Sequence, residues 1–244
     1  MWCPERTGNA LSAWVSRRDA EWRERIRFAA LDPFRGYATA LRSSLPHAVR
    51  VLDAFHVTRL GLAALDDVRR RVQQETLGHR GHRDDPLYRI RRLARRAPET
   101  LTERAWGRLL TGLDLGDPRG EVAQAYMAAH ELRFLYARGR DLPDARRRLF
   151  DVLIRCAFSG VPELERLGRT LDAWREELLA YFTTGGISNG PTEAINLLIK
   201  RIKRVGFGFR NFDNYRLRLL LHCGVDWNTL TATPIRGRLP RLVA

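Results

Sequence analysis

One predicted helix combines a carboxylate with a basic face. Glu193 follows Gly190-Pro191, a pair typical of a helix start, and therefore falls in the first helical turn. At 3.6 residues per turn, one face of this helix presents Glu193, Asn196, Lys200 and Arg204. The opposite face presents Ile195, Leu198, Ile199 and Ile202, which we expect to enter a core. The polar face thus places an acid next to groups that bind phosphate.

Two interpretations of Glu193 stay open from these residues. A first-turn carboxylate can cap its helix and interact favourably with the helix dipole, which contributes about 0.3–1 kcal/mol. Lys203 extends the basic side of the helix, and Arg210 lies in the glycine-rich, aromatic segment 206–212. Such basic and aromatic surroundings favour contact with a nucleic-acid backbone.

Acidic side chains also follow both strands that the sequence predicts. The apolar run 27–31 stops at Asp32, which is typical of a buried strand with an acid at its C-terminal end. Residues 48–56 form the second strand candidate, and its polar end contains Asp53 and His56. The C-terminal ends of both strands therefore carry side chains suited to chemistry.

Predicted helices alternate with these strands. Apolar residues recur at helical spacing over 10–26, before the first strand, and over about 34–45 and 58–77, after the first and second strands. This strand-helix-strand-helix order favours a parallel βαβ unit. The fold class predicted for the chain is α/β and helix-rich.

Residues 78–185 are predicted to form an all-helical insertion. The segment begins with a basic, glycine-punctuated loop over 78–86. Helical periodicity follows near residues 87–97, 102–112, 119–138, 143–158 and 161–182. We interpret the arginine clusters at 91–92, 95–96 and 146–148 as solvated helix faces, although a DNA-facing helix would have the same pattern.

The charge balance favours a polyanionic partner. The chain of 244 residues has 43 Lys and Arg against 28 Asp and Glu, a formal net charge of +15. Only Lys200 and Lys203 are lysines, so arginine dominates. A GC-rich genome explains a preference for Arg over Lys but not the excess of positive charge. Because arginine binds phosphate in a bidentate manner, nucleic acid is the first candidate partner.

Composition excludes several classes of protein. A hydrophobic content of 44% with 19 Gly and 11 Pro is ordinary for a globular chain. No apolar run is long enough to cross a membrane, and the N-terminus lacks the apolar core of a signal peptide, so we expect an intracellular protein. Cys3, Cys156 and Cys223 form no CxxC pair, which argues against a zinc site or a disulfide framework.

Three motifs resemble one protein family. Segments 31–37 (Leu-Asp-Pro-Phe-Arg-Gly-Tyr), 53–57 (Asp-Ala-Phe-His-Val) and 189–212, which begins Asn-Gly-Pro-Thr-Glu-Ala-Ile-Asn, resemble the catalytic half of ISL3-type insertion-sequence transposases. The resemblance covers nearly the whole chain and keeps the motifs in order. It implies a DDE transposase, in which an RNase H-like sheet carries two catalytic Asp, a helical insertion follows, and a late helix supplies a Glu.

The resemblance assigns roles to individual residues. It implies that Asp32 is the second catalytic Asp and Glu193 the catalytic Glu, and that both bind a divalent metal. Asp53 and His56 match a family motif, in which Asp53 would support the metal-binding carboxylates and His56 would pack or contact DNA. The residues expected to bind DNA are Asn196, Lys200, Lys203, Arg204 and Arg210.

The implied chemistry is phosphoryl transfer on DNA. Two Mg²⁺ or Mn²⁺ ions held by carboxylates would activate a water or a 3′-hydroxyl and stabilise the leaving oxygen. The reactions would be nicking at transposon ends and strand transfer into target DNA. We expect these DNAs as partners, together with a second copy or a full-length transposase, and no membrane. The expected location is the cytoplasm, in association with the nucleoid.

One residue of the family pattern has no match in the sequence. The first catalytic Asp of the family lies on an early strand, and none of the acids before Asp32 follows a strand-like run. We therefore expect an N-terminally truncated transposase that is inactive in isolation, with a two-metal site only if the missing Asp is supplied. The alternatives are a non-catalytic DNA-binding or inhibitory fragment and an RNA-binding or structural helical protein.

The resemblance also implies an organisation in four parts. Residues 1–77 would form a partial RNase H-like core and 78–185 the helical insertion. Residues 186–226 would complete the core, and 227–244 would form a C-terminal tail.

Overall fold

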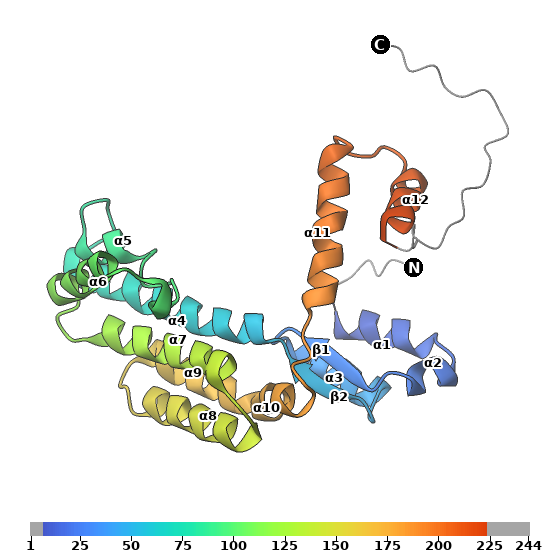
Figure 1. Cartoon of the computed structure of the whole chain (residues 1–244), viewed down its shortest axis with the longest axis horizontal. Coiled ribbons are helices and arrows are strands. Elements are labelled where there is room, and N and C mark those ends of the chain that lie inside the picture. The colour runs from blue at the N-terminus through green and yellow to red at the C-terminus, as the bar shows by residue number, and fades with distance from the viewer. Residues whose placement is uncertain (1–6, 224–244) are drawn as a thin grey trace, which may run out of the picture. The chain divides into compact units, whose positions relative to one another are not determined.

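The predicted strands and most predicted helices are present in the computed structural model, which describes residues 7–223 (Figure 1). Cys3, the end of segment 186–226 and the expected tail 227–244 lie outside the described residues. The chain divides into two compact units, residues 1–189 and 190–244, and each is described by itself. The four-part organisation stays a prediction, as does an RNase H-like core.

A two-stranded parallel sheet forms part of the first unit. β1 (Phe28–Leu31) pairs with β2 (Val49–Leu52), with Leu31 opposite Leu52. α3 (Arg35–Ser44) connects the strands, so the predicted parallel βαβ unit is confirmed. Leu31 and Leu52 are buried, which fixes the C-terminal ends of both strands in the core.

Two short helices precede this sheet. α1 (Gly8–Ser16) packs against α3, and α2 (Ala20–Glu24) follows it. The prediction of a single helix over 10–26 is wrong. The helix breaks because the side chain of Asp19 accepts the backbone N–H of Trp22 and thereby starts a new helix.

The helix after β2 begins earlier than the sequence predicts. α4 (Ala54–Leu77) starts directly after Asp53, whose side chain accepts the backbone N–H groups of Phe55 and His56. This N-cap ends the strand at Leu52, so the strand candidate 48–56 is too long. Gly78, with φ of 76°, ends α4 in the left-handed conformation.

The remainder of the first unit is helical and contains no further strand among its described residues, but the helix predicted near 87–97 ends at Ile90 and is followed by turns. Its elements are α5 (Pro86–Ile90), the 3₁₀-helix η1 (Pro98–Thr100), α6 (Glu103–Gly116), α7 (Glu121–Arg138), α8 (Leu142–Ala157), α9 (Pro162–Ala173) and α10 (Arg175–Thr183). The predicted helix over 161–182 is two helices, separated at Trp174. α7 and α9 pack along α4, and α10 packs on β2, so the helical part and the sheet share one core (Figure 1).

The second unit contains α11 (Gly190–Val205) and α12 (Phe212–Cys223), which pack on each other. The predicted helix start at Gly190 is confirmed. The predicted core face of α11 is only partly covered, because Ile199 and Ile202 are half-buried whereas Ile195 and Leu198 are 47% and 36% exposed. None of the helices within residues 7–223 is long and apolar enough to span a bilayer.

Candidate functional site

The C-terminal ends of β1 and β2 bring three of the predicted site residues together. Asp32 follows β1 and Asp53 follows β2, so the parallel pairing places both at the same edge of the sheet. His56 lies in the first turn of α4, and its Nδ1 is 3.1 Å from Asp53 Oδ1 and 3.3 Å from Asp32 Oδ1. The imidazole therefore stands between the two carboxylates.

Asp53 is a buried carboxylate with both oxygens engaged. It is 3% exposed. Its Oδ1 accepts the backbone N–H groups of Phe55 and His56, and its Oδ2 accepts the backbone N–H of Asn189 at 2.8 Å. Burial alone would raise the pKa of Asp53, but the hydrogen bonds from Asn189 and His56 outweigh burial and hold that pKa below its usual value.

Asp32 is an open carboxylate. Its side chain is 51% exposed. Its Oδ1 accepts a hydrogen bond from the side-chain amide of Asn189 at 3.1 Å. Such an accessible oxygen donor suits a hard divalent cation. Among residues 7–223, no group of three or more His, Cys, Asp and Glu side chains has the arrangement of a metal site.

Asn189 is the site residue that sequence reasoning missed. Its backbone N–H binds Asp53 and its side-chain amide binds Asp32, so one residue bridges both acids. The signal available in the sequence was its place directly before Gly190-Pro191, at the predicted start of the Glu193 helix.

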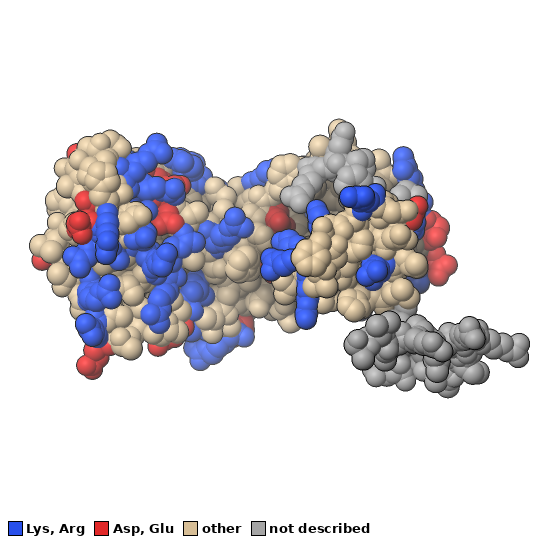
Figure 2. Space-filling view, turned by 90° about the horizontal axis from the view of Figure 1, so that it is seen from above, with Lys and Arg blue, Asp and Glu red and all other residues tan. Residues whose placement is uncertain are grey.

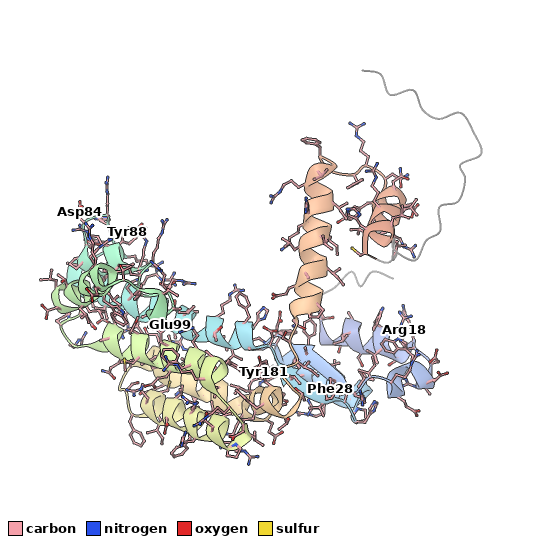
Figure 3. The ribbon with its side chains drawn as sticks, viewed as in Figure 1. Arg18, Phe28, Asp84, Tyr88, Glu99 and Tyr181 are labelled. Atoms are coloured by element: carbon pink, nitrogen blue, oxygen red, sulfur yellow. The ribbon has the colours of Figure 1, made fainter. Side chains whose placement is uncertain are left out.

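Aromatic packing fixes the chain segment that leads to Asn189. Tyr181 and Phe182, at the end of α10, pack on Tyr136 of α7 with ring centroids 5.1 and 5.7 Å apart. The backbone N–H of Gly186 then donates to the carbonyl of Tyr181 at 3.0 Å. Figure 3 shows Tyr181 close to the sheet, at the end of the helical part from which the chain returns to the site.

The other predicted site residues belong to the second unit. Glu193 lies in the first turn of α11, as predicted, and is exposed. The predicted DNA-binding residues are exposed as well: Asn196, Lys200, Lys203 and Arg204 on α11 and Arg210 before α12.

Comparison with known proteins agrees with the family resemblance. A family model described as transposase, of the DDE ISL3 type, matches residues 1–219. Two curated relatives, each named transposase for insertion sequence element IS1557, come from the Mycobacterium tuberculosis strains CDC 1551 / Oshkosh and ATCC 25618 / H37Rv. Each is 29% identical over 213 residues, which cover 79% of this chain and 46% of the relative.

The chain thus spans about half the length of these curated relatives. No solved structure matches it. The family match extends over both structural units and includes all three motifs at the strand ends and on α11. This chain belongs to the ISL3-type family of transposases.

Proposed function

We propose that this chain supplies two metal-binding carboxylates, Asp32 and Glu193, to a DDE-type transposase that cuts and joins DNA strands. The observation that carries the proposal is the open carboxylate of Asp32 at a strand end, hydrogen-bonded to Asn189. Glu193 lies four positions after Asn189, so their Cα atoms are at most about 14 Å apart. This short connection supports the proposal that Glu193 joins Asp32 in one site.

The donor set fits Mg²⁺ or Mn²⁺. These ions prefer oxygen ligands, and Mg²⁺ commonly binds one or two carboxylates together with substrate phosphates. Asp32 offers an accessible carboxylate, whereas both oxygens of Asp53 already accept N–H groups. Asp32 and Glu193 would hold the metal, and a third carboxylate would come from outside this sequence. When bound, two such ions activate the attacking oxygen and stabilise the leaving oxygen.

The proposed reactions are two phosphoryl transfers. In nicking, a water oxygen bonds to a phosphodiester phosphorus, the bond to the 3′-oxygen breaks, and a 3′-hydroxyl is released. In strand transfer, the oxygen of such a 3′-hydroxyl bonds to a phosphodiester phosphorus of the target DNA, the bond from that phosphorus to the target's 3′-oxygen breaks, and the target strand is left with a 3′-hydroxyl. The basic face of α11 would hold the phosphates through Asn196, Lys200, Lys203 and Arg204, with Arg210 beside it. Asp53 and His56 would position Asp32 and the segment around Asn189.

The fold proposed for this activity is an RNase H-like sheet that this chain provides in part. β1 and β2 would be its later strands, and the helices from α5 to α10 would be the insertion. A second copy or a longer transposase as partner stays a prediction, and so does association with the nucleoid.

The test uses metal-dependent DNA cleavage by this chain extended to the length of its relatives. Asp32→Asn and Glu193→Gln are expected to lower cleavage at least about a hundredfold while DNA binding is kept, because each removes a charged metal ligand. Asp67→Asn and Glu165→Gln are the controls. The side chains of Asp67 on α4 and Glu165 on α9 are 53% and 41% exposed, and neither residue is a predicted metal ligand. If Asp32→Ala leaves the protein's effect on DNA unchanged, the chain is a non-catalytic fragment.

A further inference from the structure

Arginines without acidic partners gather where α5 and α6 meet. Several exposed arginines elsewhere in the helical part form ion pairs, as Arg119 does with Glu75 and Arg155 with Glu131. Around α5 and α6, six exposed arginines have no ion pair with any residue that the structure describes: Arg80, Arg83, Arg89, Arg92, Arg104 and Arg108. Their positive charge is therefore available to a partner.

Three of these arginines line one groove. The groove, of about 530 Å³, lies between α5 and α6. Arg89 belongs to α5, and Arg104 and Arg108 stand one turn apart on α6. Thr111 adds a hydroxyl, and Asp84 is the one acidic residue of the lining. Three guanidinium groups thus face a single carboxylate, which leaves the groove positively charged.

The loop before α5 adds two more arginines. The rings of His79 and His82 stack with centroids 3.8 Å apart. The backbone N–H of His82 donates to Asp85 at 2.5 Å, and His79 Nδ1 is 3.4 Å from the same carboxylate. These contacts hold the loop together internally, whereas Arg80 and Arg83 stay exposed. Figure 2 shows Lys and Arg side chains gathered over the helical part of the first unit, with fewer acidic side chains between them.

We propose that the α5–α6 groove, defined by Arg89, Arg104 and Arg108, is a second DNA-binding surface that holds the phosphate backbone of a duplex. A guanidinium group matches the geometry of a phosphate and stays charged at any physiological pH. Arginines that contact phosphates carry no sequence information, so this surface binds DNA of any sequence. The inference rests on the proposed function, which makes DNA the partner.

α4 sets the separation between this groove and the candidate site. Its 24 residues span about 36 Å, from Asp53 at one end to Gly78 at the other. In Figure 3, Asp84 and Tyr88 mark the outer end, and Tyr181 marks the end close to the sheet. One turn of duplex DNA is about 34–36 Å long. A duplex bound at the candidate site therefore reaches the groove about one turn away.

The test measures binding of the full chain to a labelled DNA duplex at several salt concentrations. Arg104→Gln/Arg108→Gln removes two positive charges from the groove. Arg146→Gln/Arg166→Gln removes the same charge from one exposed arginine on α8 and one on α9, neither of which has an ion pair with a residue that the structure describes. We expect the groove variant to lower the slope of log K against log salt by about two, because each phosphate contact contributes about 0.9. The control variant is expected to keep the slope of the wild type.

A charge-conserving variant and an RNA ligand distinguish the possible outcomes of this experiment. Arg104→Lys/Arg108→Lys keeps the charge and is expected to keep most of the slope, which would show that the slope depends on positive charge at these positions; thermal unfolding checks that both variants are folded. Equal slopes for the groove and control variants would overturn the inference while leaving the proposed function intact. A wild-type chain that binds no DNA would refute the proposed function itself. If the groove variant lowers the salt slope for RNA of the same length but not for duplex DNA, the inference would also be overturned.

Discussion

Asp32 and Asp53 carry the same carboxylate at equivalent strand ends, and their surroundings give them different tasks. Asp53 is buried and accepts N–H groups at both oxygens, so it organises the backbone. Asp32 is half-exposed and faces solvent. The sequence predicts Asp32 at a strand end, because it ends an apolar run, and places Asp53 in the polar end of the strand candidate 48–56. The different roles of the two acids depend on Asn189, which lies 136 positions after Asp53 in the sequence. No local sequence pattern reveals this contact.

Replacing Asp53 tests the contact with Asn189. In Asp53→Asn the remaining oxygen can still cap α4, but the amide nitrogen cannot accept the N–H of Asn189. We expect the free energy of unfolding at pH 7 to fall by about 1–3 kcal/mol, the cost of an unpaired buried polar group. Urea denaturation measures the change. Asp67→Asn, at an exposed acid, is the control and should change stability by less than about 1 kcal/mol.

The same variant predicts a pH dependence. The pKa of Asp53 is held below its usual value, so the folded state gains stability from the carboxylate above the pKa of an unfolded Asp. That gain is lost as the pH falls through the folded-state pKa. The stability difference between wild type and Asp53→Asn should therefore be constant near neutral pH and shrink below about pH 4. A difference that persists unchanged on acidification would contradict the assignment.

At the scale of elements, Arg71 joins three helices of the first unit. It lies on α4 and donates to Glu121, in the first turn of α7, and to Glu163, in the first turn of α9. Burial alone would raise the pKa of Glu163, but the hydrogen bond from Arg71 lowers it below the usual value. The arginine therefore ties the starts of two helices to the helix that leads away from the sheet.

Removing the side chain of Arg71 should destabilise the helical part. Arg71→Met leaves the largely buried Glu163, 11% exposed, without its cation, and leaves Glu121, 15% exposed, with Arg119 alone. We expect a loss of about 2–4 kcal/mol in the free energy of unfolding. Arg70→Met is the matched control, because its partner Asp67 is exposed and such surface pairs contribute about 1 kcal/mol or less. Similar losses for both variants in thermal or urea unfolding would refute the role of Arg71.

Helices and strands were predictable where an apolar run or a typical start signal marks them clearly in the sequence. The strands, the parallel pairing and the start of α11 follow from apolar runs and from Gly190-Pro191. The predicted boundaries of helices and strands were wrong where a single side chain sets them. Asp19 and Asp53 each cap the start of a helix inside a segment whose sequence pattern continues past that point. The incomplete burial of the apolar face of α11 could not be predicted from the amphipathic pattern of the helix, because burial depends on what packs against that face.

At the scale of the whole molecule, apolar side chains are exposed around the small sheet. Phe28 and Val49 are 40% and 41% exposed at the start of the strands, and Phe34 and Phe55 are exposed near their ends. A two-stranded sheet rarely stands alone, and exposed apolar patches mark surfaces that another segment covers. This exposure supports the proposal that the sheet continues in a longer transposase.

The isolated chain is expected to bind DNA without joining strands. Its net charge of +15 should give binding that weakens steeply between low and moderate salt. Strand transfer should be undetectable, because only two of the three proposed carboxylates come from this sequence. A gel assay with purified protein, Mg²⁺ and labelled DNA measures both properties. Metal-dependent strand transfer by the chain alone would show that this expectation is wrong.

We propose that Asp32 and Glu193 hold one metal ion together. Fe²⁺ can replace Mg²⁺ and, with peroxide, cuts a protein backbone next to the bound ion. With the DNA-bound chain, we predict cuts near both Asp32 and Glu193 that excess Mg²⁺ suppresses. Asp32→Asn and Glu193→Gln should each remove both cuts, and Asp67→Asn should keep them. Cuts near only one of the two acids, or cuts that persist in both variants, would contradict a shared metal site.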